Sequence, residues 1–105
     1  MRQIRYLDAT RAELDAAVTW YRDHRTTGVA EIFLTEISDS IVQIAELPDA
    51  WPISKLDPRV RVRYLRRLRY GIFYLVDADF ITVVAVAHTS RRPGYWKDRL
   101  KDLGP

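Results

Sequence analysis

The stretch YGIFYLVDADFITVVAVAH, residues Tyr70–His88, decides the fold of this chain. Two runs rich in β-branched and aromatic residues, Tyr70–Asp77 and Phe80–His88, flank the segment Asp77-Ala78-Asp79. Residues of the first kind favour strands, and aspartates favour tight turns because their short side chains hydrogen-bond the nearby backbone. The stretch therefore predicts a β-hairpin.

Both runs of this hairpin are apolar at odd and at even positions, whereas a sheet with one solvated face alternates between apolar and polar residues. In the first run, Ile72 and Tyr74 share one face, while Phe73 and Leu75 share the other. Both faces therefore need a cover. A pair of helices can cover one face, and the other is left to the C-terminal segment or to a second polypeptide. A closed, self-sufficient core is the alternative.

Two helices are predicted before the hairpin, because apolar residues recur there every three or four positions. The first has Thr10 with Glu13 three residues later, which is the form of a capping box, and it ends at the polar stop Arg25–Gly28. The second spans Val29–Leu47 and ends at Pro48. Since the connection is short, the helices are expected to form an antiparallel pair.

The other segments complete a single domain over residues 1–105. Met1–Leu7 and Val60–Leu65 are predicted strands, and Tyr95–Leu103 is predicted to form a short helix. A chain of 105 residues is long enough for one core and too short for two. The predicted fold class is α+β, in the order β-α-α-β-β-β-α, with the helix hairpin packed on an antiparallel sheet.

The composition excludes several classes of protein. The absence of cysteine rules out a disulfide framework and a thiolate zinc site. No run approaches the ~20 apolar residues of a membrane span, and no apolar core of signal-peptide length follows the N-terminal charges. The sequence also lacks a glycine-rich phosphate loop, metal-ligand spacing and a nucleophile elbow. We therefore expect a cytoplasmic protein with no metal, no cofactor and no membrane contact.

The charge is distributed unevenly along the chain. Residues 1–52 carry 5 basic and 9 acidic side chains, a net charge of −4, whereas residues 53–105 carry 12 and 5, a net charge of +7. Of the 17 basic residues 14 are arginines, whose planar guanidinium group suits phosphate and carboxylate groups. An anionic partner for the second half is the natural inference.

The segment Arg59–Arg69 holds six arginines in eleven residues. In a strand, its alternating arginines share one face and its apolar residues share the other, so the pattern predicts an outward guanidinium stripe over an apolar inner face. A solvated outer face without a partner is the alternative. The stripe consists of Arg59, Arg61 and Arg63, opposite Val60, Val62 and Tyr64.

The end of the last strand carries the second group of candidate residues. There His88 is a potential general base or proton donor for phosphodiester cleavage, and Arg91 is a potential stabiliser of the developing charge. Arg92 and Tyr95 follow closely. The alternative is that His88 has only a structural role at the strand end.

Six segments spread over nearly the whole chain have the order and spacing of one protein family. They are Trp20-Tyr21, Gly28 with Ala30 and Phe33, Ile41 with Ile44 and Pro48, Arg63 with Leu68 and Tyr70-Gly71-Ile72-Phe73-Tyr74, Val84-Ala85-Val86-Ala87-His88, and Arg91-Arg92-Pro93-Gly94-Tyr95-Trp96. Together they resemble the RelE/ParE toxins of bacterial type II toxin-antitoxin modules, including plasmid stabilization systems. The resemblance implies growth inhibition, a tight complex with a cognate antitoxin, and operator DNA binding only through that complex.

The resemblance leaves two targets open. RelE-like members cleave messenger RNA in the ribosome, whereas ParE-like members poison DNA gyrase. RelE-type sequences tend to have Arg after the tyrosine that opens the third strand, but here Gly71 follows Tyr70. ParE-like sequences usually have Phe-Pro before that tyrosine, where this chain has Leu68-Arg69, yet the His88 to Trp96 ending is closer to ParE. We favour the ParE-like branch; a nontoxic adaptor that keeps only the fold is a third possibility.

Whether the chain is an enzyme stays open at this point, so two sets of site residues follow. For a ribonuclease, the catalytic candidates are Arg63, Arg66, His88, Arg91 and Tyr95. For binding of the target or the antitoxin, the candidates are Arg59, Arg61, Arg63, Arg67, Arg69, Arg91, Arg92, Phe73 and Leu75.

Overall fold

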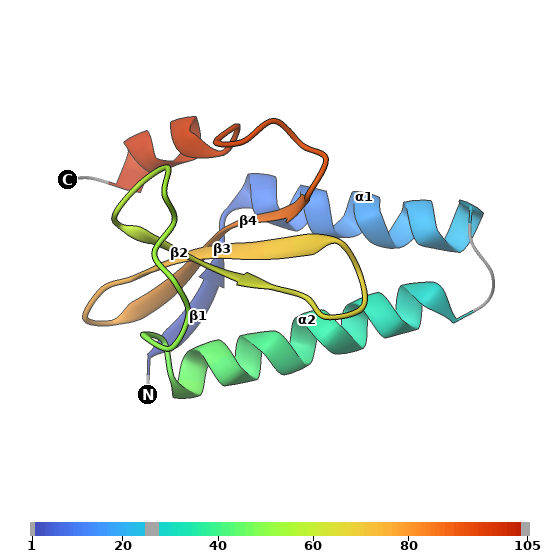
Figure 1. Ribbon diagram of the computed structural model, residues 1–105, viewed down its shortest axis with the longest axis horizontal. Helices are drawn as coiled ribbons and strands as arrows, with labels where there is room; N and C mark the ends of the chain where they lie inside the picture. Colours follow the sequence, from blue (N-terminus) through green and yellow to red (C-terminus); the bar gives the residue numbers. More distant parts are fainter. Residues whose placement is uncertain (1, 25–27, 104–105) are drawn as a thin grey trace.

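The computed structural model, described for residues 2–24 and 28–103, contains two helices, four strands and a short 3₁₀ helix (Figure 1). The predicted order of elements is confirmed, and most bounds agree within two residues. The elements are β1 (Gln3–Tyr6), α1 (Asp8–His24), α2 (Val29–Glu46), β2 (Val60–Tyr64), β3 (Tyr70–Val76), β4 (Phe80–His88) and the 3₁₀ helix η1 (Lys97–Leu103).

The four strands form one sheet in the order β1-β4-β3-β2. β2 with β3 and β3 with β4 are antiparallel, as predicted, but β1 runs parallel to β4. The expectation of a wholly antiparallel sheet is therefore wrong for one strand. A strand of four residues carries no pattern that distinguishes the two directions, and the pairing of β1 is decided by where the helix pair returns the chain.

The helix pair covers one face of the sheet. Phe33 and Ile44 of α2 are fully buried against Ile72 and Ile81, and each such side chain contributes about 1.5–3 kcal/mol by leaving water. The hydroxyl of Tyr74, on the same face, donates a hydrogen bond of 2.6 Å to the carbonyl oxygen of Pro48. This bond attaches the strand to the end of α2.

The C-terminal segment covers the opposite face. Trp96 and Leu100 are almost fully buried and pack on Val60, Val84 and Ala85. The sequence left this face to the C-terminal segment or to a second polypeptide. In the structure the C-terminal segment closes the centre of the face. In Figure 1 the tail lies beside the loop that precedes β2. It forms a 3₁₀ helix rather than the expected α-helix.

A β-bulge in β4 explains why this strand is apolar at both odd and even positions. Phe73 pairs with Ala85 and Tyr74 pairs with Val83, so Val84 has no partner on β3. The extra residue shifts the side-chain alternation by one position. Ile81 and Val83 before the bulge therefore share the helix face with Val86 after it.

The start of α1 differs from the expected capping box. The helix already begins at Asp8, and Thr10 lies inside it, fully buried. The hydroxyl of Thr10 is directed at the carbonyl oxygens of Val83 and Val84, at 3.0 and 2.6 Å, so it attaches α1 to the bulge. The predicted stop after this helix lies partly outside the described residues, and Gly28 stands at the N-terminal cap of α2 with φ of 100°.

Neither helix in the described part of the chain is long and apolar enough to cross a membrane.

Candidate functional site

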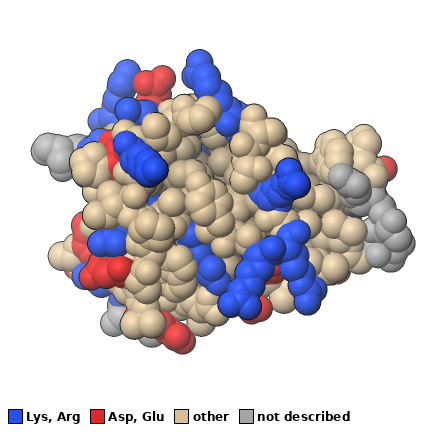
Figure 2. Space-filling view, in the orientation of Figure 1, with Lys and Arg blue, Asp and Glu red and all other residues tan. Residues whose placement is uncertain are grey.

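The turn between β2 and β3 and the end of β4 meet at one corner of the molecule. Tyr70 pairs with His88, and the backbone N–H of Thr89 donates to the carbonyl oxygen of Arg69 at 2.8 Å. The two segments bring together five exposed arginines, which we name the basic corner: Arg66, Arg67, Arg69, Arg91 and Arg92. Figure 2 shows groups of Lys and Arg side chains standing out from this face of the molecule.

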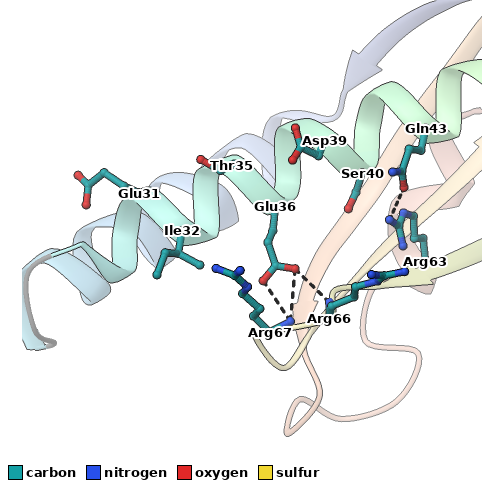
Figure 3. A pocket seen from close by; sticks show the side chains of 10 residues that line it. All are labelled: Glu31, Ile32, Thr35, Glu36, Asp39, Ser40, Gln43, Arg63, Arg66 and Arg67. Carbon is teal, nitrogen blue, oxygen red and sulfur yellow. Dashed lines mark hydrogen bonds between the residues drawn. The ribbon is translucent and has the colours of Figure 1, made fainter.

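Glu36 of α2 fixes the turn that carries the first of these arginines. Its carboxylate accepts hydrogen bonds from the backbone N–H groups of Arg66 at 3.0 Å and Arg67 at 3.1 Å. Because the carboxylate binds the main chain, the two side chains extend past it along the groove beside α2 (Figure 3). Within the described residues neither guanidinium group has an ion pair.

The predicted outward stripe of Arg59, Arg61 and Arg63 is wrong for Arg61 and Arg63, whereas Arg59 is exposed. Arg59 precedes β2 and pairs with Asp57 at 3.0 Å. Hydrogen bonds from the side chain and backbone of Arg59 hold the pKa of the Asp57 carboxyl below its ordinary value. This pair stabilises the loop before β2, while the Arg59 side chain stays 48% exposed.

Arg61 and Arg63 lie on the helix face of β2, since they pair with Tyr74 and Ile72 of β3. Arg61 donates to the carbonyl oxygen of Trp51 at 2.6 Å. Arg63 lies over the Trp51 ring at 4.9 Å and donates to the side chain of Gln43 in α2. Both arginines thus join β2 to the end of the helix pair. Alternation along the strand was predicted correctly, but the arginine face is not the outer one.

An apolar groove of about 520 Å³ runs between the C-terminal segment and the loop before β2. Its wall includes Tyr64 and Phe73, whose rings meet edge to face at 6.5 Å. Ile53, Leu56 and Tyr64 are exposed there, at 51%, 39% and 55%. The cationic residues on the lining are Lys55, Arg91 and Arg92. The groove is apolar at its base and positive at its edge.

Gly71 keeps the wall of this groove in place. A Cβ atom at this position would lie 3.0 Å from the ring of Tyr64 and 3.2 Å from the ring of Phe73. A long side chain here would displace an aromatic ring. The RelE-type arginine after the tyrosine therefore has no room in this chain.

The candidate catalytic residues do not converge on one point. Arg63 and Arg66 line the groove beside α2, which has a volume of about 560 Å³. Arg91 and Tyr95 line the apolar groove, where the guanidinium of Arg91 lies 3.9 Å from the Tyr95 ring centre. His88 also contributes to that lining, but its ring contacts Tyr70. These positions are divided between two grooves.

The polar atoms of His88 and Tyr95 have partners inside the protein. The backbone N–H of Ser90 donates to Nδ1 of His88 at 3.1 Å, which makes this nitrogen an acceptor and places the proton of the neutral ring on Nε2. The Tyr95 hydroxyl donates to Glu13, and burial followed by this carboxylate raises the tyrosine pKa above its ordinary value. Neither group is free to accept a proton from a substrate by these atoms.

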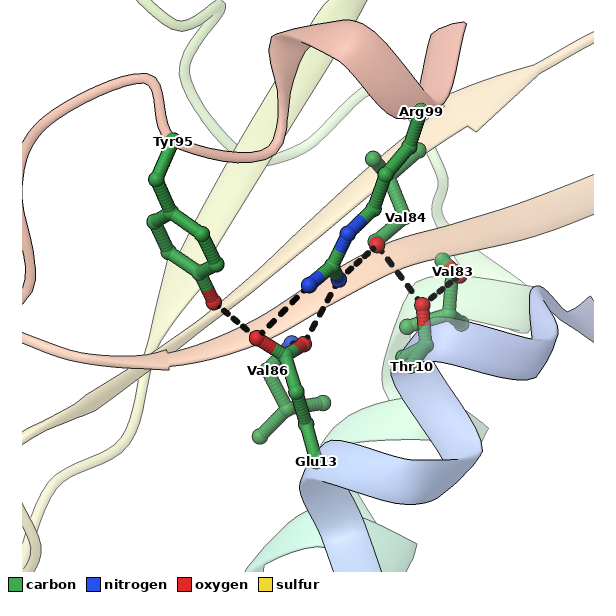
Figure 4. A network of polar contacts seen from close by, with 7 residues as sticks. All are labelled: Thr10, Glu13, Val83, Val84, Val86, Tyr95 and Arg99. Carbon is green, nitrogen blue, oxygen red and sulfur yellow. Dashed lines mark hydrogen bonds and ion pairs between the residues drawn. The ribbon is translucent and has the colours of Figure 1, made fainter. Parts of the chain in front are cut away.

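Glu13 is the centre of a polar network that sequence analysis missed (Figure 4). Besides Tyr95, it binds Arg99 at 2.8 Å, and Arg99 in turn donates to the carbonyl oxygen of Val84 at 3.0 Å. The backbone N–H of Val86 donates to Glu13 at 3.2 Å. The network links α1, the bulge and the C-terminal segment across more than 70 positions, so no local spacing signals it.

Comparison with known proteins places these features in context. Residues 4–93 match the model of the family described as the ParE toxin of the type II toxin-antitoxin system parDE. Among solved structures, the chain is similar to one described as the chromosomal ParDE toxin-antitoxin system from P. aeruginosa, with a TM-score of 0.73 and 19% identity over 84% of this chain and 96% of that one. It is also similar to the isolated E. coli RelE toxin, with a TM-score of 0.60 and 17% identity over 99% and 100% of the two chains. No curated protein sequence matches.

Proposed function

Because the chain belongs to the ParE toxin family of type II toxin-antitoxin systems, we propose that it arrests growth by binding DNA gyrase and that a cognate antitoxin neutralises it. Its role as a toxin follows from the family. The target is inferred from the ParE-like ending of the sequence and from the arrangement of the candidate site.

One observation carries the choice of binding over cleavage: the residues suited to ribonuclease chemistry are separated. General acid-base catalysis needs its groups within hydrogen-bond reach of one reacting phosphodiester. Here Arg63 and Arg66 lie beside α2, while Arg91 and Tyr95 lie in the apolar groove. The hydroxyl of Tyr95 is also occupied by Glu13. A protein with this arrangement is better suited to hold a partner than to cut RNA.

The proposed contact surface for the target is the basic corner. Arg67, Arg69, Arg91 and Arg92 are exposed there, as a surface that meets an anionic partner requires. Arg59, Arg61 and Arg63 act in this proposal by fixing the position of β2 and its preceding loop. Of the two apolar candidates, Phe73 lines the apolar groove, and Leu75 packs partly buried under the C-terminal segment, away from the corner.

The apolar groove is the proposed seat of the antitoxin. Exposed Ile53, Leu56 and Tyr64 offer apolar contacts, and the cations at the edge complement an acidic segment. We therefore expect the cognate antitoxin to supply an amphipathic segment whose apolar side enters the groove and whose acidic side faces Lys55 and Arg92. A short acidic reading frame adjacent to this gene is the first candidate.

Purified toxin added to gyrase and relaxed plasmid tests the target. We expect supercoiling to be inhibited and an equimolar amount of antitoxin to restore it. In cells, induction of the toxin should trigger a DNA-damage response while transcripts stay intact. Full gyrase activity together with codon-phased cuts in translated messages would contradict the proposal.

A ribosome-dependent mRNA endonuclease is the second candidate, since Arg91, Tyr95 and His88 all contribute to the lining of the apolar groove. This activity would require His88 or Tyr95 in proton transfer. Toxicity of His88→Ala and Tyr95→Phe separates the candidates: a gyrase-binding toxin keeps its effect in both variants, whereas an endonuclease loses it in at least one.

A further inference from the structure

We propose that the basic corner binds the phosphodiester backbone of duplex DNA directly. Gyrase acts on duplex DNA. This inference therefore deepens the proposed function, because the toxin would contact the DNA as well as the enzyme. Its biological setting rests on that proposed function, whereas the DNA contact itself is a property of this chain.

The first support is that the guanidinium groups of the corner form no ion pair within the described residues, although that of Arg91 lies over the Tyr95 ring at 3.9 Å. Within the described residues, Arg66, Arg67, Arg69 and Arg92 take part in no ion pair. Other arginines have carboxylate partners, such as Arg99 with Glu13. The exposed arginines of the corner therefore stay available for anions from outside.

The second support is the absence of acidic residues from the segments that build the corner. Residues 58–76 and 80–97 contain no Asp or Glu. Asp57, Asp77 and Asp79 lie towards the opposite end of the sheet, where β2 begins and where β3 turns into β4. A polyanion at the corner therefore meets no carboxylate from these segments.

The acidic residues near the corner belong to α2, and they fix the direction of approach. The Glu36 carboxylate is occupied by backbone N–H groups. Glu31 and Asp39 line the groove beside α2 together with Arg66 and Arg67, as Figure 3 shows. A phosphate backbone is repelled along that groove. It therefore approaches the end of the sheet, where the β2–β3 turn and the end of β4 lie side by side.

The third support is that the backbone of the corner is already held in place. Glu36 fixes the turn, and the bond from Thr89 N–H to the Arg69 carbonyl joins the turn to the end of β4. Binding then requires ordering of side chains only, which lowers its entropic cost. Thr89, on the same segment, is exposed, and a hydroxyl is a typical phosphate donor.

The chemistry of the corner fits a nucleic acid better than an acidic protein. A protein interface is built around an apolar centre. Among the described residues, the large exposed apolar side chains lie beside the two segments of the corner and not in them, with Ile32 in the groove beside α2 and Tyr64 in the apolar groove. Phosphate contacts need only cations and hydroxyls. Tyr70 is packed against Phe33 at 4.9 Å, so it offers no free ring for stacking unpaired bases, and this favours a duplex over a single strand.

Fluorescence anisotropy with a labelled duplex of about 20 base pairs and purified toxin tests the inference. Contacts to three or four phosphates release about as many counterions, so raising the salt from about 50 to 200 mM should weaken binding on the order of 100-fold. The variant Arg66→Gln/Arg67→Gln/Arg69→Gln should bind at least about tenfold more weakly and lose most of this salt dependence. These side chains have no internal ion pair, so the fold should persist, as an unchanged circular dichroism spectrum would verify.

The matched control is Arg2→Gln/Arg11→Gln/Lys101→Gln, which removes the same net charge far from the corner and should bind DNA nearly as well as the wild type. Equal weakening in both triple variants would overturn the inference, because binding would then reflect net charge alone. Preferential binding of single-stranded DNA would also overturn it, and so would preferential binding of poly-glutamate as the acidic-protein probe.

The experiments distinguish failure of the DNA-binding inference from failure of the gyrase proposal. A toxin that inhibits gyrase but does not bind the duplex contradicts only this inference. A toxin that binds the duplex through the corner but leaves supercoiling unaffected contradicts only the gyrase proposal.

Discussion

At the scale of single residues, the side chain of Glu13 joins three segments of this fold. Its carboxylate is 13% exposed and accepts hydrogen bonds from Tyr95, Arg99 and the backbone of Val86. Burial of a carboxylate is costly unless it is paired and hydrogen-bonded. Both conditions are met for Glu13. Its carboxylate therefore joins α1 to β4 and to the C-terminal segment.

Glu13→Gln should lower the free energy of unfolding by about 3 kcal/mol, because Arg99 would be left largely buried without its counter-charge. Tyr95→Phe is the matched control. It removes one hydrogen bond to the same carboxylate and should cost about 1 kcal/mol. Urea denaturation at neutral pH measures both. Equal losses in the two variants would show that the charge of Glu13 has no special part in the network.

Buried tyrosines predict alkaline sensitivity. Burial raises the pKa of Tyr74 to about 12, against an ordinary value of 10.0. A group whose pKa is raised on folding contributes its full stability below its unfolded pKa and loses that contribution as the pH rises through the folded pKa. Stability should therefore fall between about pH 10 and pH 12. Tyr74→Phe, less stable at pH 7 because it lacks the bond to Pro48, should show a smaller fall when urea midpoints are followed across this range.

Sequence reasoning at this scale identified residue types but not distant partners. Thr10 and Glu13 have the spacing of a capping box, yet both bind β4, 73 or 74 positions away. Arg61 and Arg63 were predicted on a common face, and this is confirmed by their pairing with Tyr74 and Ile72, but that face is turned towards the helix pair. Local pattern gives alternation, whereas direction depends on which elements cover each face.

At the scale of elements, the C-terminal segment has an importance that its length does not suggest. η1 has seven residues, which is too short for a stable isolated helix. Its stability comes from Trp96 and Leu100 on the sheet and from the attachment of Arg99 to Glu13. Apolar side chains and one ion pair thus hold a segment that has no intrinsic tendency to stay folded.

Trp96→Ala should reduce the free energy of unfolding by about 3–5 kcal/mol, since this side chain is 1% exposed and its loss leaves a large cavity against Val60 and Ala85. Trp20→Ala, at a site that is 45% exposed, is the control and should cost far less. Thermal and urea unfolding compare the two. A small loss for Trp96→Ala would mean that the C-terminal segment is only loosely attached.

Element bounds were the most predictable feature of this chain. The second hairpin strand, Phe80–His88, was predicted with the bounds observed, and the second helix was predicted to within one residue. These depend on periodicity and breakers within the segment itself. The parallel pairing of β1, the bulge at Val84 and the 3₁₀ form of η1 depend on contacts between distant segments, so no local pattern predicts them.

At the scale of the whole molecule, the charge asymmetry seen in the sequence becomes a geometric one. The positive second half places five exposed arginines at the basic corner, while Arg59 and Arg61 pair with Asp57 and Asp49. The sequence thus predicted an anionic partner. The fold reduces the number of arginines that are free to bind it. Arg67, Arg69 and Arg92 were among the predicted contact residues and are exposed.

The proposed seat of the antitoxin gives a test at this scale. Antitoxin at about 100 times its Kd should stabilise the toxin by about 2.7 kcal/mol and raise its Tm. The variant Leu56→Ser/Tyr64→Ser, which removes two exposed apolar residues of the groove, should lose most of this shift. Leu34→Ser/Val42→Ser removes similarly exposed residues from α2 and should retain it. If calorimetry shows that the α2 variant loses the Tm shift and the groove variant retains it, the antitoxin binds the helix pair instead.

The closure of the second sheet face by Trp96 and Leu100 has a consequence for timing in the cell. Because the chain's own tail closes this face, we expect the toxin to stay folded without its antitoxin. If the antitoxin is degraded first, the toxin should remain folded and should no longer be inhibited. The lifetime of the toxin then depends on Trp96 and on the seven residues of η1 that follow it.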